Sequence, residues 1–343
     1  MCDDKAVIPA VKSQINQWFL ANVLPFSQRK ATLNPVLAKA EATPKMINVR
    51  KDGTGDFTTI TDAVKAIPAG NTNRVIIYIG PGVYTEKILI ERTKPFVTLY
   101  ANAKAPATVQ FSGTAKKFGT FDSATIVVES DYFVAANLII KNSALRPTAT
   151  EAMAGAQALA LRLSGDMAAL YNCKMYGYQD TFCDEKGRHF FKDCYIEGTV
   201  DFIFGSGKSL YVNTELHIIP EKWRTVITAQ AKHGSNEDSG FSFVHCTISG
   251  TGKSDAYLGR AWVKMAEVVY SYTYISNAIL PEAWDNHGFS PENMYFGEFQ
   301  NIGPGANLSG RKYSKHLTAA EATKFMCLGY IMGSQWLLPP PSY

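Results

Sequence analysis

Short apolar runs separated by turn residues make up most of the middle of the chain. Val, Ile, Phe and Tyr cluster in residues 75–79, 83–90, 96–100, 125–128 and 133–140, with Gly, Asn and Pro between the clusters. Runs of this length, rich in β-branched and aromatic residues, are typical of β-strands. The pattern therefore predicts a fold built mainly from strands.

Three short segments have a helical pattern instead. Apolar residues recur at helical intervals over residues 15–23, which predicts one amphipathic helix flanking the main body. A second short helix is expected after the turn at residues 52–60, through Ala63, Val64 and Ile67 to a stop at Pro68, where it would close the open end of a stack of coils. Thr318 and Glu321 form a capping box, which predicts a third helix near the end of the chain.

A short repeat is the most informative part of the strand pattern. Segments 173–182 and 194–203 carry Cys, Gly and Asp at the same offsets, 21 residues apart, so Asp180 and Asp201 occupy equivalent positions. A period of about 20 residues is typical of a solenoid, in which equivalent residues of neighbouring coils lie one above the other. The two aspartates are therefore expected on one face of adjacent coils.

Weaker copies of the repeat extend it in both directions. Residues 137–142, 246–250 and 273–277 resemble the same strand, and the longest gap between copies is expected to hide an extra coil. A β-sandwich would need two-residue hairpin turns such as Asn-Gly, which are largely missing. We therefore expect an all-β, right-handed parallel β-helix with short flanking helices, the hand following the preference of parallel crossovers.

The composition is compatible with one large domain. The 343 residues are 46% hydrophobic and 19% charged, with 17 Tyr and 19 Phe, which is enough apolar material for a continuous core. We expect an N-terminal extension with a helix over residues 1–45 and a single β-helix catalytic domain over residues 46–343.

Charge and hydropathy exclude some classes of partner. The net charge is +4 without a dense Lys/Arg block, which argues against nucleic acid but is compatible with a polyanionic substrate. No apolar run reaches the ~18 residues of a membrane span, so no membrane partner is expected. The first residues lack the apolar region of a signal peptide, so a processed secreted chain and a cytosolic one both fit.

Six cysteines are spread along the chain without a CxxC pair or a metal-like cluster. Cys173, Cys194 and Cys246 each precede a short strand-like run, so we expect them as free thiols in an inward stack, although disulfides stay an alternative. No metal site is predicted.

The equivalent aspartates are candidate catalytic groups. Neighbouring strands lie roughly 4.8 Å apart, and two like charges that close cannot both ionise readily, so one pKa rises while the other stays low. A nucleophile and a general acid need such a difference. The alternative, that Asp180 and Asp201 only stabilise turns between strands, is equally open on the repeat alone.

Two glutamines extend the candidate site. Gln157 lies 22 residues before Gln179, which lies 22 residues before Asp201, so the three are expected in one column if the strand bends near Gln179. Neutral amides offer N–H donors to an oxyanion beside a carboxylate nucleophile. Surface positions without chemistry are the alternative for lone glutamines.

Arg260 and Trp262 complete the set of candidates. An arginine can hold a carboxylate with two parallel N–H bonds and keep it ionised. Trp262 is two residues further on, on the same strand face, where it could lie against a sugar ring. A surface ion pair and a core tryptophan are the alternatives.

Several segments together resemble the successive signature segments of plant pectin methylesterases. The resemblance extends from about Ile47 to Leu338 and is most similar to pollen-allergen-type members, which lack a long inhibitory pro-region. The matching segments are Gly82-Val-Tyr84-Thr-Glu86, Gln157-Ala-Leu-Ala-Leu161, Tyr178-Gln-Asp180-Thr-Phe182, Gly198-Thr-Val-Asp201-Phe-Ile-Phe-Gly205, Leu258-Gly-Arg260-Ala-Trp262, Tyr295-Phe-Gly-Glu298 and Gly303-Pro-Gly305.

The resemblance implies a right-handed parallel β-helix and a carboxylic ester hydrolase. It implies hydrolysis of the C6 methyl ester of galacturonate in pectin, without metal or organic cofactor, during cell wall modification. It further implies a secreted monomer of the cell wall, a proteinaceous pectin methylesterase inhibitor as second partner, and allergenicity of the pollen type.

Individual roles follow from the matching positions. Asp201 would attack the ester carbonyl, Asp180 would protonate the departing methanol and then activate water, Gln157 and Gln179 would hold the oxyanion, and Arg260 would orient Asp201. The substrate-binding residues implied by the resemblance are Thr120, Gln157, Phe182, Phe202, Arg260 and Trp262.

The chain departs from the family pattern at three places. Ala261 stands where proline is usual, Cys183 stands where an aromatic residue is usual, and residues 146–154 lengthen the loop before Gln157. These differences bear on substrate preference and specific activity more than on the type of reaction.

Three rival functions stay open on the residues. A polygalacturonase on this fold would also use paired aspartates. A pectate lyase would need a cluster of acidic calcium ligands, whereas the site segments offer only two aspartates. A carbohydrate-binding β-helix with a dead site would be expected to lack the acid, the nucleophile or the arginine.

Overall fold

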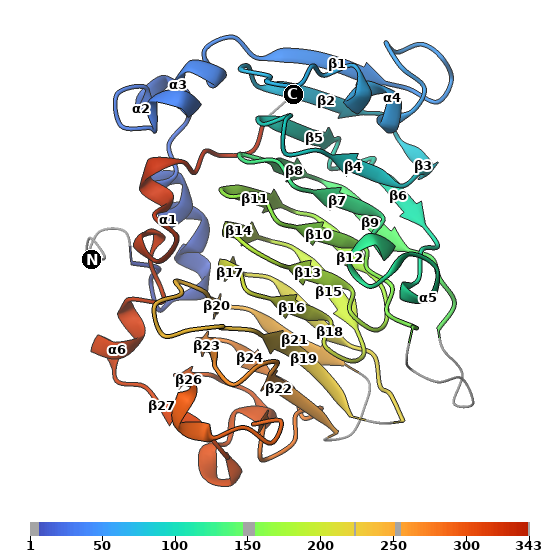
Figure 1. Ribbon diagram of the computed structural model, residues 1–343. Helices are drawn as coiled ribbons and strands as arrows, with labels where there is room; N and C mark the ends of the chain where they lie inside the picture. The colour runs from blue at the N-terminus through green and yellow to red at the C-terminus, as the bar shows by residue number, and fades with distance from the viewer. Residues whose placement is uncertain (1–6, 147–154, 223, 251–254, 342–343) are drawn as a thin grey trace.

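The computed structural model describes residues 7–146, 155–222, 224–250 and 255–341. Within these residues, strands wind around one axis and form three sheets, each extending along the length of the molecule (Figure 1). Neighbouring strands in a sheet come from successive coils and pair in parallel. The expected right-handed parallel β-helix is confirmed.

The three sheets are called the long sheet, the site sheet, which carries the candidate site, and the third sheet. The long sheet contains β1 (Lys45–Val49), β2 (Val75–Ile79), β5 (Val97–Ala101), β8 (Val134–Ala136), β11 (Ala168–Tyr171), β14 (Arg188–Lys192), β17 (Lys208–Val212), β20 (Gly240–Val244), β23 (Ala266–Ser271), β26 (Met294–Phe299) and β27 (Ser314–His316). The site sheet contains β4 (Ile88–Ile90), β7 (Ile126–Val128), β10 (Leu161–Leu163), β13 (Phe182–Asp184), β16 (Ile203–Gly205), β19 (Thr225–Gln230), β22 (Ala256–Ala261) and β25 (Trp284–Asp285). The third sheet contains β3 (Gly82–Thr85), β6 (Ala107–Phe111), β9 (Leu138–Asn142), β12 (Lys174–Tyr176), β15 (Tyr195–Gly198), β18 (Glu215–Ile218), β21 (Thr247–Gly250) and β24 (Tyr274–Ile275).

Single left-handed residues turn the chain from the long sheet into the third sheet. Asn137, Asn172, Asp193 and Asn213 have φ of 62°, 48°, 58° and 50°. Asparagine and aspartate tolerate this conformation better than most residues with a Cβ. The side chains also bond between coils, since Asn172 Nδ2 donates to Asn137 Oδ1 at 2.9 Å and Asn213 Nδ2 donates to Asp193 Oδ1 at 2.6 Å.

The repeat predicted from sequence follows these turns. Cys173, Cys194 and Cys246 directly follow a left-handed residue, and all three are buried free thiols, as expected. The long gap between Cys194 and Cys246 holds one more coil, whose strand β18 pairs with β15 and β21. The expected extra coil is therefore present.

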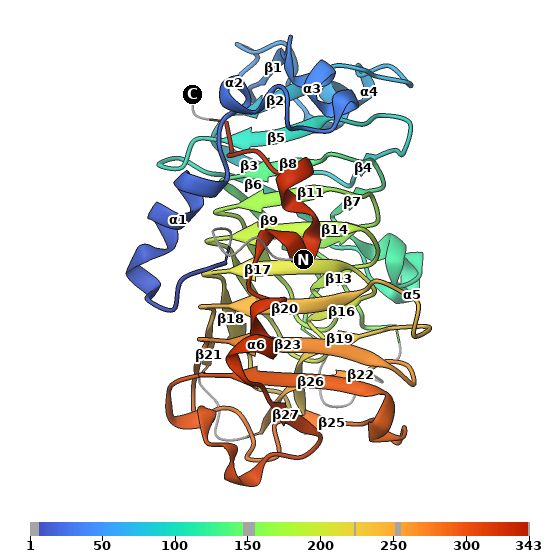
Figure 2. The same ribbon diagram turned by 90° about the vertical axis from the view of Figure 1, so that its left-hand side faces the viewer.

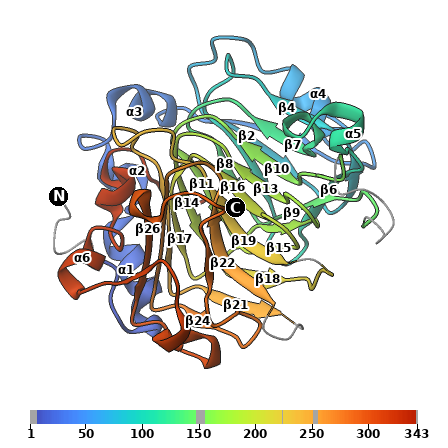
Figure 3. The same ribbon diagram turned by 60° about the horizontal axis from the view of Figure 1, so that its bottom comes forward.

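Stacked side chains fill the interior of the coils. Phe191, Tyr211, Phe243 and Tyr270 come from successive strands of the long sheet and form a continuous stack, with ring centroids 4.4, 4.5 and 4.6 Å apart. Aromatic stacking of this kind adds to the free energy gained by burying apolar surface. Figure 3 brings the lower end of the molecule forward and shows the successive coils in an oblique view.

Most helices cover the first end and the long-sheet face of the β-helix, whereas α5 (Ala115–Phe118) lies on the other side of the molecule (Figure 1). The others are α1 (Ile15–Asn22), α2 (Phe26–Arg29), α3 (Pro35–Glu41), α4 (Ile60–Lys65) and α6 (Ala319–Thr323). The amphipathic helix, the helix that closes the stack and the capped C-terminal helix are confirmed as α1, α4 and α6. Figure 2 shows the C-terminal segment running across the long sheet beside α1.

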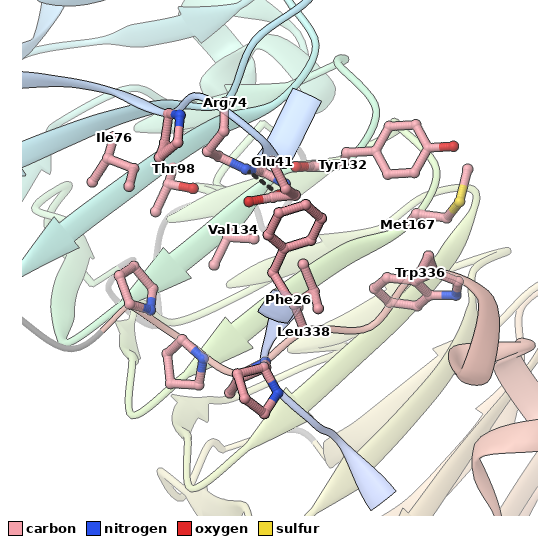
Figure 4. Close-up of a pocket in the computed structure, with 16 residues that line it drawn as sticks. Phe26, Glu41, Arg74, Ile76, Thr98, Tyr132, Val134, Met167, Trp336 and Leu338 are labelled. Atoms are coloured by element: carbon pink, nitrogen blue, oxygen red, sulfur yellow. Dashed lines mark hydrogen bonds and ion pairs between the residues drawn. The ribbon is translucent and has the colours of Figure 1, made fainter. Parts of the chain in front are cut away.

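The N-terminal and C-terminal segments meet on the long sheet around a pocket of about 350 Å³ (Figure 4). Its walls include Phe26, Trp336 and the prolines 339–341. Arg74 and Glu41 form an ion pair of 2.6 Å at this pocket, and both side chains are largely buried. This ion pair links the end of α3 to the residue that precedes β2. The division into residues 1–45 and 46–343 stays a prediction, with β1 beginning at Lys45.

Candidate active site

Asp180 and Asp201 lie in equivalent turns of adjacent coils, where the chain passes from the third sheet into the site sheet. Both have left-handed backbones, with φ of 61° and 52°. The backbone N–H of Asp180 donates to the carbonyl oxygen of Val200 at 3.0 Å, which links the two turns directly. The bend expected near Gln179 is therefore made by Asp180 itself.

Arg260 holds Asp201 with two bonds. Its Nε donates to Asp201 Oδ1 at 2.8 Å, and its Nη2 donates to Asp201 Oδ2. Arg260 comes from β22, which is two strands beyond β16 in the site sheet, and its ladder partners are Ala229 of β19 and then Phe204 of β16. Its side chain therefore reaches back across the sheet to the turn that carries Asp201. The predicted two-bond contact is present.

Asp180 has a different environment although it is almost equally buried. Asp180 and Asp201 are 6% and 2% exposed. Among the described residues, no side chain donates a hydrogen bond or pairs with the Asp180 carboxyl group, whereas Asp201 has the guanidinium of Arg260. The repeat alone could not distinguish the two aspartates, but their partners do.

The pKa values of the pair reflect this difference. Burial raises the pKa of Asp180 well above its ordinary value, and the nearby Asp201 carboxylate raises it further. Burial also raises the pKa of Asp201, but the two bonds from Arg260 oppose that rise. Of the two carboxyl groups, Asp180 therefore holds its proton more strongly, and Asp201 ionises first.

Gln157 and Gln179 lie on the coils that lead to this pair. Ala158 donates its backbone N–H to the carbonyl oxygen of Gln179 at 3.2 Å, so the two segments are neighbours. Gln157 Oε1 accepts from the backbone N–H of Gly155 at 3.1 Å, which leaves its Nε2 group as a donor for other partners. Gln179 Oε1 is buried and has no hydrogen-bond partner among the described residues. Each side-chain amide therefore keeps a polar atom that makes no hydrogen bond to the described residues.

Trp262 and Thr120 lie where a substrate could contact them. The ring of Trp262 is 46% exposed and lies 5.3 Å from the guanidinium of Arg260, so it is not a core tryptophan. Thr120 is half-buried and precedes the short turn 121–123, close after α5. The backbone N–H of Ala115 in α5 donates to the carbonyl oxygen of Gln157 at 2.8 Å, which places this segment beside the Gln157 coil.

The expectation that Phe182 and Phe202 line a substrate cleft is wrong. Both side chains have no exposed surface and belong to the core inside the coils. Phe204 has the outward position instead, because its strand neighbour Ile203 is paired with the inward Phe182. Phe204 stacks on the exposed ring of Phe121, with centroids 6.4 Å apart. Strict alternation within β16 would have identified Phe204.

His287 is a neighbour of the site that sequence reasoning missed. Its Nδ1 lies 3.1 Å from Nη1 of Arg260, the guanidinium nitrogen that does not contact Asp201. His287 follows β25, which pairs with β22 so that Asp285 stands opposite Arg260. No local motif signals this contact, because it joins two residues 27 positions apart that only the pairing of β22 with β25 brings together.

The described residues show no metal-binding cluster and no membrane-spanning helix, and two of the positions that depart from the family pattern are buried. The described ranges hold no group of three or more His, Cys, Asp or Glu side chains that could bind a metal ion. None of the described helices has the length and apolar character needed to cross a bilayer. Ala261 and Cys183 are fully buried. The lengthened loop begins at Arg146, and its remaining residues, 147–154, lie outside the described residues.

Known proteins similar in sequence cover nearly the whole chain. A family model described as Pectinesterase matches residues 46–334. Probable pectinesterase 50 of Arabidopsis thaliana is 47% identical over 347 residues, which cover 100% of this chain and 94% of that protein. Pectinesterase 2 of Olea europaea is 50% identical over 346 residues, covering 99% of this chain and 93% of that protein.

Solved structures with the same fold point to the same family. Pectin methylesterase from carrot matches with a TM-score of 0.79 and 30% identity, covering 88% of this chain and 98% of that one. Pectin methylesterase PemA from Erwinia chrysanthemi matches with a TM-score of 0.73 and 27% identity, covering 86% and 98% of the two chains. Family model, relatives and fold agree, and the chain belongs to the pectinesterase family.

Proposed function

We propose that this chain hydrolyses the C6 methyl ester of galacturonate units in pectin, with Asp201 as nucleophile and Asp180 as general acid and base. The unequal partners of the two aspartates carry this assignment. Arg260 keeps Asp201 ionised and directed, while the buried Asp180 makes no ion pair with a described side chain and holds a proton. One solved pectin methylesterase of this fold is described in complex with a hexasaccharide, which supports an oligosaccharide substrate here.

In the first half-reaction, an oxygen of Asp201 attacks the ester carbonyl carbon. The carbonyl oxygen gains negative charge, which the amide N–H groups of Gln157 and Gln179 stabilise. The C–O bond to the methoxy group then breaks as Asp180 donates its proton to that oxygen, and methanol leaves. The products are an anhydride between Asp201 and the C6 carbonyl and an ionised Asp180.

In the second half-reaction, Asp180 accepts a proton from a water molecule that attacks the same carbonyl carbon. The bond to Asp201 breaks, which releases the galacturonate carboxylate and returns Asp201 to its ionised form. Asp180 is protonated again, so the cycle closes without another reactant. Trp262 and Thr120 are proposed to position the sugar, with Arg260 and Gln157 also facing it.

The wider setting of this activity is part of the same proposal. A secreted monomer acting on cell wall pectin fits a pectinesterase, and a proteinaceous inhibitor is the second partner that we propose. Lack of an inhibitory pro-region and allergenicity stay predictions.

Methanol release from highly methylated pectin tests the reaction. We expect methanol without new reducing ends, which a polygalacturonase would produce, and without unsaturated ends, which a lyase would produce. Release should persist in the presence of a chelator. Asp201→Asn and Asp180→Asn should each lower kcat by about 1,000-fold or more, because each removes a group that acts in the transition state.

Asp193→Asn is the matched control. Asp193 has the same left-handed turn conformation, with φ of 58°, but lies in the turn into the third sheet. Asparagine preserves that conformation at all three positions, so a loss confined to Asp180 and Asp201 reflects chemistry and not folding. Full activity of Asp201→Asn would contradict the mechanism.

A further inference from the structure

We propose that His287 is a positioning residue, which holds the Arg260 guanidinium against Asp201 by accepting a hydrogen bond from Arg260 Nη1 at its unprotonated Nδ1. This inference rests on the proposed function of Asp201 and goes beyond it by assigning a residue that acts through Arg260. It also makes the nucleophile sensitive to the protonation of a histidine.

The geometry divides the guanidinium between two partners. Nε and Nη2 donate to the two oxygens of Asp201, while Nη1 lies 3.1 Å from His287 Nδ1. A guanidinium is planar and has no acceptor, so its contact with a ring nitrogen requires that this nitrogen carry a lone pair. A third bond in the plane of the fork restricts rotation of Arg260 away from Asp201.

The loop that carries His287 is ordered by its own bonds. Asp285 Oδ1 accepts from the backbone N–H of His287 at 2.8 Å, and Asn286 Nδ2 donates to the carbonyl oxygen of Phe289 at 2.6 Å. His287 has a left-handed φ of 52°, a conformation that needs such support in a residue with a Cβ. These hydrogen bonds fix the turn that places the histidine ring beside Arg260.

Protonation of His287 reverses the contact. A protonated Nδ1 has no lone pair, so the bond from Nη1 is lost and two cations face each other. The charged groups around the ring are Arg260 on β22, Asp201 at the start of β16, and Asp285 on β25. Asp285 bonds the backbone of His287, and Asp201 is already held by Arg260, so neither replaces the lost bond to the ring.

Two variants distinguish the role of the hydrogen-bond acceptor of His287 from the role of its aromatic ring. His287→Asn places an amide oxygen near the position of Nδ1, tolerates the left-handed backbone and never gains charge. His287→Phe keeps an aromatic ring beside Phe289, which lies 6.0 Å away between centroids, but has no acceptor. We expect kcat to fall about 3- to 10-fold in His287→Phe, with KM little changed, because one neutral hydrogen bond is lost.

The pH dependence gives the decisive readout. The wild-type kcat/KM should contain an ionisation that lowers activity as the pH falls. His287→Asn should lose that ionisation and keep kcat within about twofold of the wild-type value measured above it. A ring that only contacts sugar would instead raise KM in the asparagine variant, and that result would overturn the inference.

A spectroscopic measurement is independent of turnover. The Nε–H signal of Arg260, assigned by its absence in Arg260→Lys, should shift with pH in the wild-type protein and stay constant in His287→Asn. Equal pH dependence in both proteins would overturn the role of His287. If wild-type protein released no methanol, the proposed function would fall, while this comparison would still decide whether His287 holds Arg260.

Discussion

Asp180 and Asp201 are chemically identical residues at identical positions of a repeat, and their surroundings raise their pKa values to different extents. Both are buried, and burial disfavours the charged form of each. Arg260 provides two donors to Asp201 and none to Asp180 among the described residues. One arginine therefore divides the pair into the proposed nucleophile and the proposed acid.

Replacing Arg260 by lysine tests this division. Lysine offers a point charge without the two parallel donors of a guanidinium, so the pKa of Asp201, already raised by burial, should rise further. Because the nucleophile must be ionised, the acid limb of kcat/KM should move to higher pH. We also expect kcat to fall about 10- to 100-fold, from the loss of a charge-assisted hydrogen bond.

Arg188→Lys is the control for this prediction. Arg188 also contacts an aspartate with two nitrogens, Nε and Nη2 to Asp166, but on the long sheet. Its replacement should leave the pH profile of activity unchanged. An unshifted acid limb in Arg260→Lys would show that Arg260 does not control the ionisation of Asp201.

At the scale of elements, the same turn device serves both structure and chemistry. Left-handed Asn and Asp residues turn the chain into the third sheet, and left-handed Asp180 and Asp201 turn it into the site sheet. The two interpretations of the aspartates left open by the repeat are thus not exclusive. Both residues form turns between strands, and the turns place their carboxyl groups at the start of β13 and β16.

Asn213 allows the structural part of this device to be measured. Asn213→Ala removes the bond to Asp193 and places an ordinary side chain at φ 50°, whereas Asn213→Gly removes only the bond. The alanine variant should therefore be less stable than the glycine variant by about 1 kcal/mol. Urea unfolding curves measure this difference.

Lys174→Ala provides the reference for an exposed position on the third sheet, with an expected change within about 0.5 kcal/mol. Equal destabilisation by alanine and glycine at position 213 would mean that the left-handed backbone carries no strain there.

At the scale of the whole molecule, a fully buried polar network lies within the apolar interior. His189 Nδ1 lies 2.5 Å from Asp184 Oδ1, and Tyr211 donates to Asp184 Oδ2 at 2.5 Å, with all three side chains fully buried. The second ring nitrogen of His189 lies 2.9 Å from the carbonyl oxygen of Gly165. The network joins β13 of the site sheet to β14 and β17 of the long sheet across the interior.

This network predicts how stability depends on pH. Burial alone would lower the pKa of His189, but the Asp184 carboxylate and the bond to Gly165 together raise it. A raised folded pKa contributes stability that is complete below the unfolded value of about 6.5 and is lost as the pH rises through the folded value. The free energy of unfolding should therefore decrease over that window in the wild-type protein.

His189→Gln should abolish this decrease and lower stability by about 3 kcal/mol at the acidic end, because it leaves Asp184 without its cationic partner. The exposed His233→Gln variant should behave as wild type. Unfolding measured at a series of pH values separates these outcomes, and a wild-type curve that rises with pH through this window would contradict a charged His189.

Much of the fold followed from local sequence. The Cys, Gly and Asp of segments 173–182 and 194–203 predicted coils, the thiol stack and the equivalence of the aspartates, all of which the structure contains. The error at Phe202 has a local cause. Alternation holds only within β16, where Ile203 faces inward and Phe204 outward, whereas Phe202 precedes that strand, directly after the left-handed Asp201, and also lies in the core.

By itself, the sequence determined the coil, because a period of about 20 residues and the turn preferences of Asn and Asp act within one repeat. Only the tertiary structure decided which coils meet at the site. Paired residues lie 21 apart between β13 and β16, 25 apart between β16 and β19 and 31 apart between β19 and β22, and these unequal separations together place Arg260 on Asp201 and His287 on Arg260. The lengths of loops that leave the coil do not change its local pattern, so contacts between distant coils emerge only when the strands are in register.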